Sequence, residues 1–486
     1  MSLSLKSDEL LLRLFSNLEG VREHLPRERY YSHGQLFGII DQYRNEPAFV
    51  LTTEGHSVEG REIVLVKTGT GRQRVFMWAQ MHGDEPTANS ALMDLLRFLK
   101  EPGEFEGIRD TILNGITLYI MPLVNPDGAE RFTRENANKL DLNRDAIDLA
   151  SPESRVLMAA FKKIKPHFAF NLHDQGRAHA VGKTGRSATI SFLAPPPDEE
   201  KTTTKNRENA MKLISELTGV LDEIIPGHTG RYSDEYEPRA FGDTFQSMGA
   251  ATILIESGGW SFDYERNFQR GLNFVLFIKG LFSIATGNYK KYETGAYLAL
   301  PENRKLLYDH FVTGALFDGG ARNIGINLKE KMSLPGRAVW FEGMIQAVGA
   351  LKGRSGYHEF LASGYKIKPG KTLEPGDKMY PGSGELLSEI EVAKEIDHEN
   401  FYRFIEAGYT NIRVSGEGSD KRHTPLPLNL VSVKGKRRVN YDLTPGHPAN
   451  ILLYKGKKVD YAFINGFFIH VTSRHLYPVN ALHFKP

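Results

Sequence analysis

Short apolar runs recur through the first 290 residues of the chain, and polar or helix-like stretches separate them. Five of these runs have the composition of β-strands: Glu62–Val66, Val75–Ala79, Ile116–Val124, Phe168–Leu172 and Thr252–Ile255. Strands that alternate with helical stretches are typical of a sheet with crossover helices on its faces. The pattern from about residue 45 to residue 290 therefore predicts an α/β domain.

Helical periodicity is clearest in the stretches between these runs. Glu85–Lys100 carries four apolar side chains at helical spacing: Ala88, Leu92, Leu95 and Leu99. Ser151, Pro152 and Glu153 form a helix start, because they offer an N-cap hydroxyl, a proline at the first helical position and an acid near the helix dipole. Glu199–Ile225 is long and amphipathic. We expect a helix in each of these places.

The pattern changes after about residue 296, where turn dipeptides multiply. Pro-Gly pairs begin at residues 369, 375, 381 and 445, and short alternating runs occur at Asn429–Val433, Ile451–Tyr454 and Phe467–Val471. This pattern predicts a smaller β-rich accessory domain over residues 296–486. With 486 residues the chain exceeds one ordinary core. We therefore expect a helical lead-in over residues 1–44, a main domain over residues 45–290 and the accessory domain.

Charge and composition exclude several classes of protein. The 61 Lys and Arg nearly balance the 59 Asp and Glu, so the net charge is +2 and lacks the cationic excess of a nucleic-acid-binding protein. The basic stretch Lys434–Arg438 is interpreted as a solvated hairpin turn. The most apolar stretch, Phe274–Ala285, is broken by Lys279 and Gly280, so we expect no membrane span. The compartment stays open, and a soluble periplasmic or secreted protein is favoured over a cytoplasmic one.

The absence of cysteine restricts the chemistry that the chain can perform. Without cysteine there is no disulfide framework, no thiolate metal site and no cysteine nucleophile. A bound metal must therefore be held by His, Asp and Glu.

Four of the predicted strands are followed by residues that can bind a metal or transfer a proton. Val75–Ala79 leads to His82 and Glu85, and the other three lead to Asn125, to His173 and to Glu256. Ligands of open α/β sheets bind outside the carboxyl ends of the strands, so these segments are expected to meet in one crevice.

His82, Glu85 and His173 have the composition of a catalytic zinc site. His82 and Glu85 are three residues apart at a turn that enters a helix, and His173 adds a second imidazole. Two histidines and one carboxylate leave a fourth position for water, and a nearby carboxylate such as Glu256 can take a proton from that water. The alternatives are a core histidine at His173 and a surface carboxylate at Glu256.

A further segment supplies a resemblance to a known family. Asn125-Pro126-Asp127-Gly128, then Arg134, then Asp141-Leu142-Asn143-Arg144 resembles the zinc carboxypeptidases of the carboxypeptidase A type, the M14 peptidases, and the order also matches at His82, Glu85 and His173. The similarity covers about residues 45–288. It implies an α/β/α sandwich with a mixed, mostly parallel sheet.

The resemblance also implies a role for each residue of the motif. One zinc ion per chain would be bound by His82, Glu85 and His173, and Asp141 would orient His82 from behind. The catalytic residues would be Glu256, as the proton carrier, and Arg134, which would stabilise the oxyanion. The substrate's terminal carboxylate would bind Asn143 and Arg144. Tyr236 would be the mobile loop tyrosine of the family, although Tyr232 lies in the same polar stretch.

Substrate preference is less well specified by the sequence. Gly242 falls where the family's side-chain pocket is usually set, so we expect no strong preference for a basic terminal residue from that position. Four arginines lie in the loops between His173 and Glu256, and one that pointed inward would favour an acidic end: Arg177, Arg186, Arg231 and Arg239. The alternative is that all four are solvated.

Taken with the resemblance, these features predict a zinc metallocarboxypeptidase that removes a C-terminal residue from a peptide with a free carboxylate. A zinc deacylase of N-acyl amino acids is the alternative enzyme, since that related class has a similar His-Gly-X-Glu turn and Asn-Arg pair. A non-catalytic peptide- or carbohydrate-binding protein on the same scaffold is the third hypothesis. The oligomeric state is left open.

Overall fold

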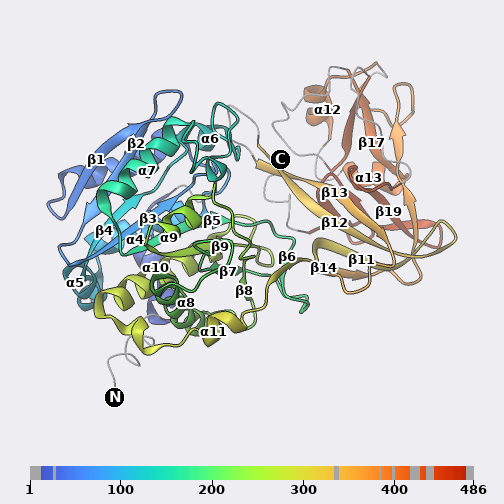
Figure 1. The fold of residues 1–486 in the computed structure, drawn as a ribbon. Coiled ribbons are helices and arrows are strands. Elements are labelled where there is room, and N and C mark those ends of the chain that lie inside the picture. The colour runs from blue at the N-terminus through green and yellow to red at the C-terminus, as the bar shows by residue number, and fades with distance from the viewer. Residues whose placement is uncertain are drawn as a thin grey trace. The chain divides into compact units, whose positions relative to one another are not determined.

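The structure is a computed structural model, and it describes residues 12–25, 29–332, 339–382, 385–396, 400–415, 427–433 and 443–477. The chain divides into two compact units between Lys305 and Leu306 (Figure 1). The basic stretch at residues 434–438 lies outside the described residues. In the part of the chain that is described, no helix is long and apolar enough to cross a membrane.

The first unit is built on an eight-stranded sheet in the order β1-β2-β4-β3-β5-β9-β7-β8. Its strands are β1 (Phe49–His56), β2 (Glu62–Thr68), β3 (Gln73–Ala79), β4 (Ile116–Met121), β5 (Phe168–Asp174), β7 (Ile190–Leu193), β8 (Thr229–Arg231) and β9 (Ala251–Ser257). The central strands β4, β3, β5 and β9 run parallel, as do β7 and β8, whereas the remaining neighbours pair antiparallel. The sheet is therefore mixed, with its parallel core in the middle.

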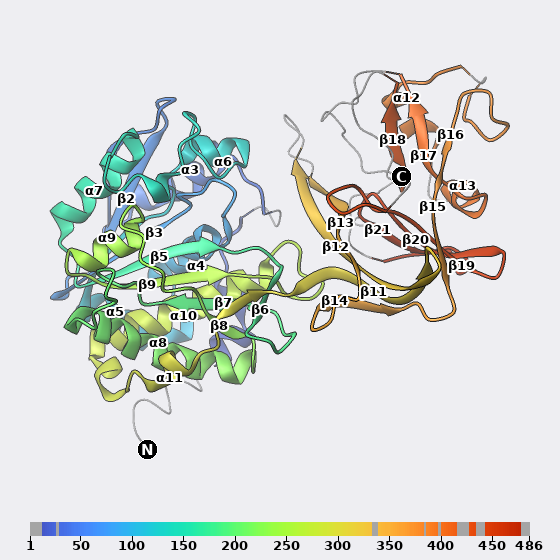
Figure 2. The ribbon, with the colours of Figure 1, turned by 45° about the vertical axis from the view of Figure 1, so that its right-hand side comes forward.

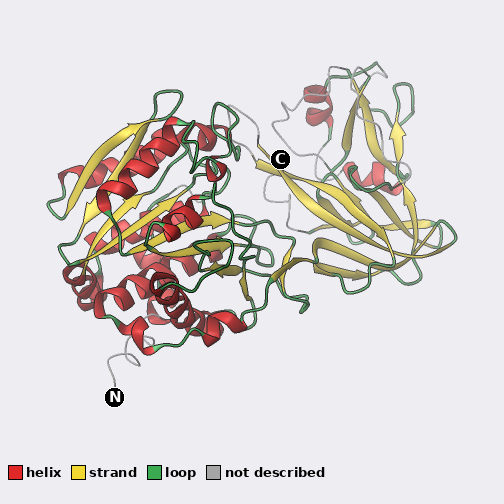
Figure 3. Ribbon diagram, in the orientation of Figure 1, coloured by secondary structure: helices red, strands yellow, loops and turns green. Residues whose placement is uncertain are grey.

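Helices cover both faces of this sheet (Figure 3). They are α2 (Leu18–Val21), α3 (His33–Asp41), α4 (Thr87–Lys100), α5 (Glu106–Gly115), α6 (Pro126–Arg131), α7 (Pro152–Ile164), α8 (Lys205–Ile224), α9 (Phe241–Ser247), α10 (Asn267–Thr286) and α11 (Gly295–Ala299), with short 3-10 turns at Gln42–Asn45, Gly103–Phe105, Leu142–Arg144 and Asn288–Lys291. One core joins the sheet to α4, α5, α8 and α10, and a second joins the opposite face to α7 and α9. The predicted α/β/α sandwich is confirmed.

Alternate residues of the central strands face these two cores, which explains their continuous apolar runs. On β3, Met77 belongs to the first core and Trp78 to the second, and both are fully buried. A strand buried on both faces must be apolar throughout, as is typical of parallel sheets. These strands hold their carboxyl ends firmly in place, and the site residues follow directly.

The predicted elements are present, with shifted ends. The strand predicted to reach Val124 ends at Met121, and the predicted helices at Glu85 and Glu199 begin at Thr87 and Lys205. The helix predicted from Ser151 begins there, but the Ser151 hydroxyl makes no cap hydrogen bond. It accepts a hydrogen bond from Asn136 instead, so the predicted N-cap contact is wrong.

Both ends of the first unit differ from the divisions expected from the sequence. Leu14, Leu36 and Tyr43 belong to the same core as α4 and α10, so the described part of the lead-in packs as part of the main unit. At the other end, Tyr297 is buried in that core and its hydroxyl accepts a hydrogen bond from the Ala194 amide. Residues 296–305 thus belong to the first unit, because an apolar anchor holds them there.

The second unit is rich in strands, as expected. A nine-stranded sheet among its described residues contains β11 (Leu307–Phe317), β12 (Gly320–Met332), β13 (Val339–Gly349), β14 (Ser355–Leu361), β15 (Lys366–Pro369), β19 (Asn450–Lys455), β20 (Lys458–Ile464), β21 (Phe467–His470) and β22 (His475–Leu476). A three-stranded parallel sheet of β16 (Lys371–Leu373), β17 (Tyr409–Val414) and β18 (Asn429–Ser432) lies beside the helices α12 (Glu389–Glu395) and α13 (Phe401–Glu406) (Figure 2).

Candidate metal centre

His82 and Glu85 lie in a tight turn between β3 and α4. Gln80 opens the turn with a left-handed backbone (φ 51°), and its side-chain amide donates to the carbonyl of Gly83. A Cβ atom at Gly83 would collide with the backbone of Gly128, so only glycine allows these two loops to approach so closely. The turn is therefore fixed by backbone packing as well as by hydrogen bonds.

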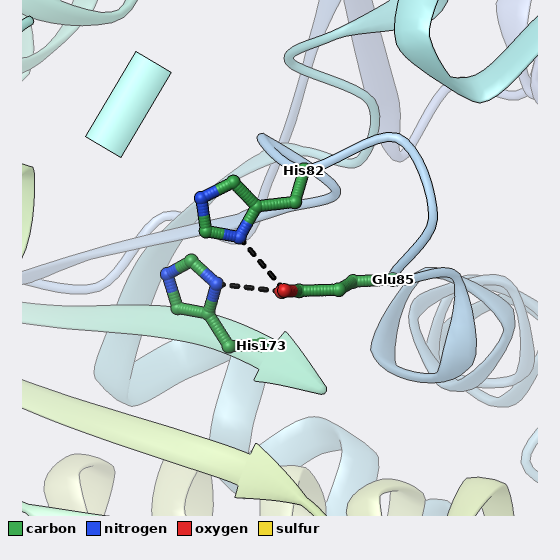
Figure 4. Close-up of side chains that lie close together, drawn as sticks. All are labelled: His82, Glu85 and His173. Atoms are coloured by element: carbon green, nitrogen blue, oxygen red, sulfur yellow. Dashed lines mark hydrogen bonds and ion pairs between the residues drawn. The ribbon is translucent and has the colours of Figure 1, made fainter. Parts of the chain in front are cut away.

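Three side chains converge at the end of the parallel sheet (Figure 4). The Nδ1 atom of His82 lies 2.8 Å from Oε1 of Glu85, and the Nδ1 atom of His173 lies 2.8 Å from Oε2 of the same carboxylate. One ligand atom from each residue lies within 4.8 Å of the others, and all three residues are buried. Sequence reasoning had placed these residues in one site, and the structure brings them together.

The donor set fits a metal ion. Two imidazole nitrogens face one carboxylate, and these are the nitrogen and oxygen donors that zinc prefers in the absence of thiolates. The backbone amide of Asp174 also donates to Oε2 of Glu85 at 3.1 Å, which fixes the orientation of the carboxylate. His82, Glu85 and His173 can thus hold a metal with two histidines and one acid.

Asp141 supports His82 from the far side of its ring. The Nε2 atom of His82 lies 3.1 Å from Oδ1 of Asp141, while the Nε atom of Arg134 donates to Oδ2 at 3.1 Å. Burial acts to raise the pKa of Asp141, but the hydrogen bonds and charges of His82 and Arg134 outweigh it and hold the pKa well below its usual range. Burial likewise acts to lower the pKa of His82, but the charge of Glu85 and the bond to Asp141 raise it to about 9.

Glu256 stands next to this cluster on strand β9. Its partner in the strand register is His173, and both residues are buried. Oε2 of Glu256 has no hydrogen-bond partner among the described residues. Burial, reinforced by the charge of Glu85, raises the pKa of Glu256 well above its usual range. A buried carboxyl with a raised pKa is a candidate for a group that takes up and releases a proton.

A cavity of about 620 Å³ opens in front of these groups. Its floor consists of two rows of side chains on one face of the sheet. His173 and Glu256 form the outer row, and the strand register continues it to Ser191 beside the cavity. Asn171, Leu254 and Leu193 form the row two residues deeper. Both rows are contributed by β5, β9 and β7, so the floor is rigid.

The two residues predicted to bind a carboxylate line the same cavity. Oδ1 of Asn143 accepts a hydrogen bond from the amide of Phe241, which is the first residue of α9. The Nη1 atom of Arg144 donates to the Asn143 carbonyl, and its Nε atom lies 3.4 Å from Oε2 of Glu237. Arg134 also lines the cavity, with Nη1 3.4 Å from Oε1 of Glu85. The cations therefore lie within the cavity that contains the candidate metal ligands.

Two tyrosines line the cavity, and they differ in their surroundings. Tyr232 follows strand β8, its amide donates to the carbonyl of Phe192, and the pKa of its hydroxyl is raised chiefly by the charge of Glu256. Tyr236 lies in the loop beyond, and burial and Asp243 raise its pKa. Tyr232 is thus the tyrosine that the charge of Glu256 affects, an electrostatic relationship that spacing along the chain could not reveal.

At the expected side-chain pocket, Asp243 lines the cavity, and neither Gly242 nor the four loop arginines are among the residues that line it. Asp243, next to Gly242, lines the cavity, and burial raises its pKa to about 7. The four loop arginines do not line it. They contact other groups: Arg177 the Trp260 carbonyl, Arg186 the Pro226 carbonyl, Arg231 the ring of Tyr297 and Arg239 the Glu237 carboxylate. None of the four arginines lines the cavity in this structure.

The model of the zinc carboxypeptidase family matches residues 40–149, a segment that contains His82, Glu85, Arg134, Asp141 and Arg144. Over this segment the chain is similar to the zinc carboxypeptidase family. His173 and Glu256 lie beyond the matched segment.

Individual relatives are similar to part of this chain. Carboxypeptidase 2 of Trichophyton rubrum is 28% identical over 166 residues, which are 34% of this chain and 29% of that protein. Carboxypeptidase SOL1 of Arabidopsis thaliana is 32% identical over 130 residues, 25% of this chain and 26% of that protein. The chain thus matches under a third of the length of either relative.

Solved structures show a distant likeness. The metallo-carboxypeptidase of Pseudomonas aeruginosa is 17% identical, with a TM-score of 0.43, over 54% of this chain and 71% of that chain. Carboxypeptidase A of Helicoverpa armigera is also 17% identical with a TM-score of 0.43, over 59% of this chain and 81% of that chain.

Proposed function

We propose that the protein is a zinc-dependent metallocarboxypeptidase, which hydrolyses the last peptide bond of a peptide with a free C-terminal carboxylate. One zinc ion per chain would be held by His82, Glu85 and His173. Glu256 would be the catalytic carboxylate beside it. The observation that carries this proposal is that the candidate metal ligands, Glu256 and the Asn143–Arg144 pair line one cavity.

Each residue has a task that follows from its position. Arg144, with Asn143, binds the terminal carboxylate of the substrate, because a guanidinium matches a carboxylate with two parallel hydrogen bonds. Arg134 faces the cavity beside Glu85, where a fixed cation stabilises the negative charge that develops on the scissile carbonyl oxygen. Zinc, when bound, supplies Lewis acidity that polarises the carbonyl and acidifies water.

Glu256 carries the proton between the two halves of the reaction. It accepts a proton from the attacking water and delivers it to the leaving amine, so one carboxyl serves first as base and then as acid. Its raised pKa, caused by burial and by the charge of Glu85, suits a group that must hold the proton in between. Asp141 keeps His82 in the orientation that presents Nδ1 to the metal.

The proposal is tested with metal analysis and three substrate sets. Purified protein should contain about one zinc per chain, as the single three-ligand cluster among the described residues implies. It should release the last residue from free-acid peptides and leave the corresponding C-terminal amides nearly untouched. N-acyl amino acids form the third set: preferential cleavage of these would favour the deacylase, and binding without turnover on every set would favour a non-catalytic protein.

A further inference from the structure

The strand that joins the two units also forms a wall of the cavity. Strand β10 (Asn303–Lys305) pairs antiparallel with β6 (His179–Val181), so that Asn303 lies opposite Val181 and Lys305 opposite His179. Two neighbouring backbone bonds extend this attachment: Gly182 donates to the Glu302 carbonyl and Arg231 donates to the Pro301 carbonyl. The segment is therefore fixed to the first unit immediately before the second unit begins.

Asn303 points into a network of side-chain amides. Its Nδ2 group donates to Oε1 of Gln175 at 2.9 Å and to the Ser191 hydroxyl at 2.8 Å. The Ser191 hydroxyl lies 3.1 Å from Oδ1 of Asn303, and Nε2 of Gln175 donates to the Ser191 hydroxyl and to the Ala188 carbonyl. A Cβ atom at Gly230 would collide with Oδ1 of Asn303, so glycine at that position makes room for the amide.

This network lies on the side of Glu256 away from the carboxylate-binding pair. Gly242, at the start of α9, lies against Asn171 of the deeper row, and Asn143 is bonded to the same helix start. Gln175 and Gly176 instead follow the end of β5, beyond the outer row of His173 and Glu256. A peptide whose carboxylate binds Arg144 and whose last amide bond lies at Glu256 must continue outward past Gln175.

We propose that Asn303 and Gln175, together with Gly176 and His179, form a subsite for the peptide backbone on the amino-terminal side of the scissile bond. All four line the cavity. The proposal rests on the proposed function and names its substrate class: peptides of at least three residues, bound through their backbone N–H groups.

The hydrogen bonds within the network determine which donors and acceptors the subsite can offer to a peptide. Both N–H groups of each side-chain amide are engaged within the network. An amide oxygen has two lone pairs, so Oδ1 of Asn303 and Oε1 of Gln175 each retain one for an incoming N–H donor. Burial lowers the pKa of His179, so its ring stays neutral and adds no charge at neutral pH. The subsite accordingly offers acceptors to a neutral peptide backbone.

The experiment compares substrate length across matched variants. The substrates are an N-acylated dipeptide, which ends close to the scissile bond, and a pentapeptide with the same last two residues. For the wild-type protein we expect kcat/KM to be about tenfold or more higher for the pentapeptide, since each added hydrogen bond contributes up to about tenfold. Asn303→Ala should lower kcat/KM for the pentapeptide toward the dipeptide value and change the dipeptide value little.

Three controls make the result specific. Arg304→Ala changes the exposed neighbour on the same strand and should leave both values unchanged. Gln175→Met removes the second amide and should reproduce the effect, which keeps the test valid if Asn303→Ala does not fold. An N-methyl group on the pentapeptide backbone upstream of the scissile bond should lower kcat/KM for the wild type and have little further effect in Asn303→Ala.

The outcomes separate the two proposals. Equal cleavage of both substrates by the wild type, or an equal loss on both substrates in the two amide variants, would overturn the subsite and leave the carboxypeptidase proposal standing. Cleavage of neither substrate by zinc-loaded wild-type protein would overturn the carboxypeptidase proposal, and the subsite with it.

Discussion

His173 and Glu256 are direct neighbours in the register of two adjacent parallel strands, β5 and β9. Side chains that pair in this way leave the sheet on the same face, so the imidazole and the carboxyl point into the same cavity. Neither strand can shift by one residue without turning its side chain to the other face. The distance between candidate metal ligand and candidate proton carrier is therefore fixed by the sheet.

Glu256→Gln should separate proton transfer from metal binding. The amide is isosteric and cannot carry the proton, so we expect kcat to fall by about 10²–10⁴-fold. Zinc content and melting temperature should stay close to those of the wild type, because Glu256 is not among the three clustered ligand atoms. Normal turnover by this variant would show that another group carries the proton.

Asp141→Asn should weaken zinc binding without removing a ligand. Its carboxylate holds Nε2 of His82 at 3.1 Å, and loss of such a partner commonly costs about 10–100-fold in metal affinity. The measurement is a zinc titration against a competing chelator. Asp148→Asn, an exposed change a few residues away, is the matched control and should leave the affinity unchanged.

Arg144 and the substrate carboxylate should show thermodynamic coupling. Arg144→Ala and amidation of the peptide terminus should each lower kcat/KM, and the two together should cost little more than one, because contacting partners are non-additive. Fully additive losses would mean that Arg144 does not contact the carboxylate. Glu237→Gln should lower KM, since Glu237 lies 3.4 Å from the same guanidinium and competes with the substrate for it.

Asp243 should make the fold less stable as the pH rises. Burial raises its pKa in the folded protein from 3.8 to about 7, so between these values the folded state keeps a proton that the unfolded chain releases. The free energy of unfolding therefore falls as the pH rises through this window and levels off above pH 7. Asp243→Asn should raise the stability by about 1–3 kcal/mol at pH 8 and by almost nothing at pH 4. Urea denaturation at the two pH values checks this; equal effects would place the pKa elsewhere.

The two cavity tyrosines should differ in their effect on turnover. Tyr232 continues a strand and the charge of Glu256 raises the pKa of its hydroxyl, whereas Tyr236 lies in a loop. Tyr232→Phe should therefore lower kcat by about three- to tenfold, the effect of removing one hydrogen bond from the hydroxyl to the substrate. Tyr236→Phe should change kcat less. If steady-state kinetics showed a larger loss of kcat for Tyr236→Phe than for Tyr232→Phe, Tyr236 would have the role that the family resemblance implies.

The sequence predicted the centre of the first unit well, because its chemistry is local. β3 carries an unbroken apolar run at Val75–Ala79, and β5 is buried along nearly its whole length. His82 and Glu85 follow β3 within six residues, and His173 lies on β5 itself. A residue that lies so close to the end of a buried strand can occupy only a small region near that end. The fold class, the convergence of these three side chains and the placement of Glu256 beside them were therefore all accessible from the pattern.

What the sequence did not predict depends on contacts between distant segments. Asn303 lies 128 positions from Gln175, yet the two amides are bonded across the cavity wall. The orientations of the four loop arginines were equally inaccessible, since each is fixed by a carbonyl, a ring or a carboxylate elsewhere in the fold. The family resemblance assigned the pocket position to Gly242, whereas Asp243 lines the cavity. Which of two adjacent residues faces the cavity depends on the orientation of helix α9, which the sequence does not give.

The attachment of β10 bears on how the first unit can be produced by itself. A gene fragment that stops at residue 290, the end that the sequence pattern predicts for the main domain, would omit Tyr297 and Asn303 and would leave the edge of β6 unpaired. An unpaired strand edge promotes aggregation. A stop codon placed after Lys305 keeps this strand, the buried tyrosine and the outer wall of the cavity on the same polypeptide.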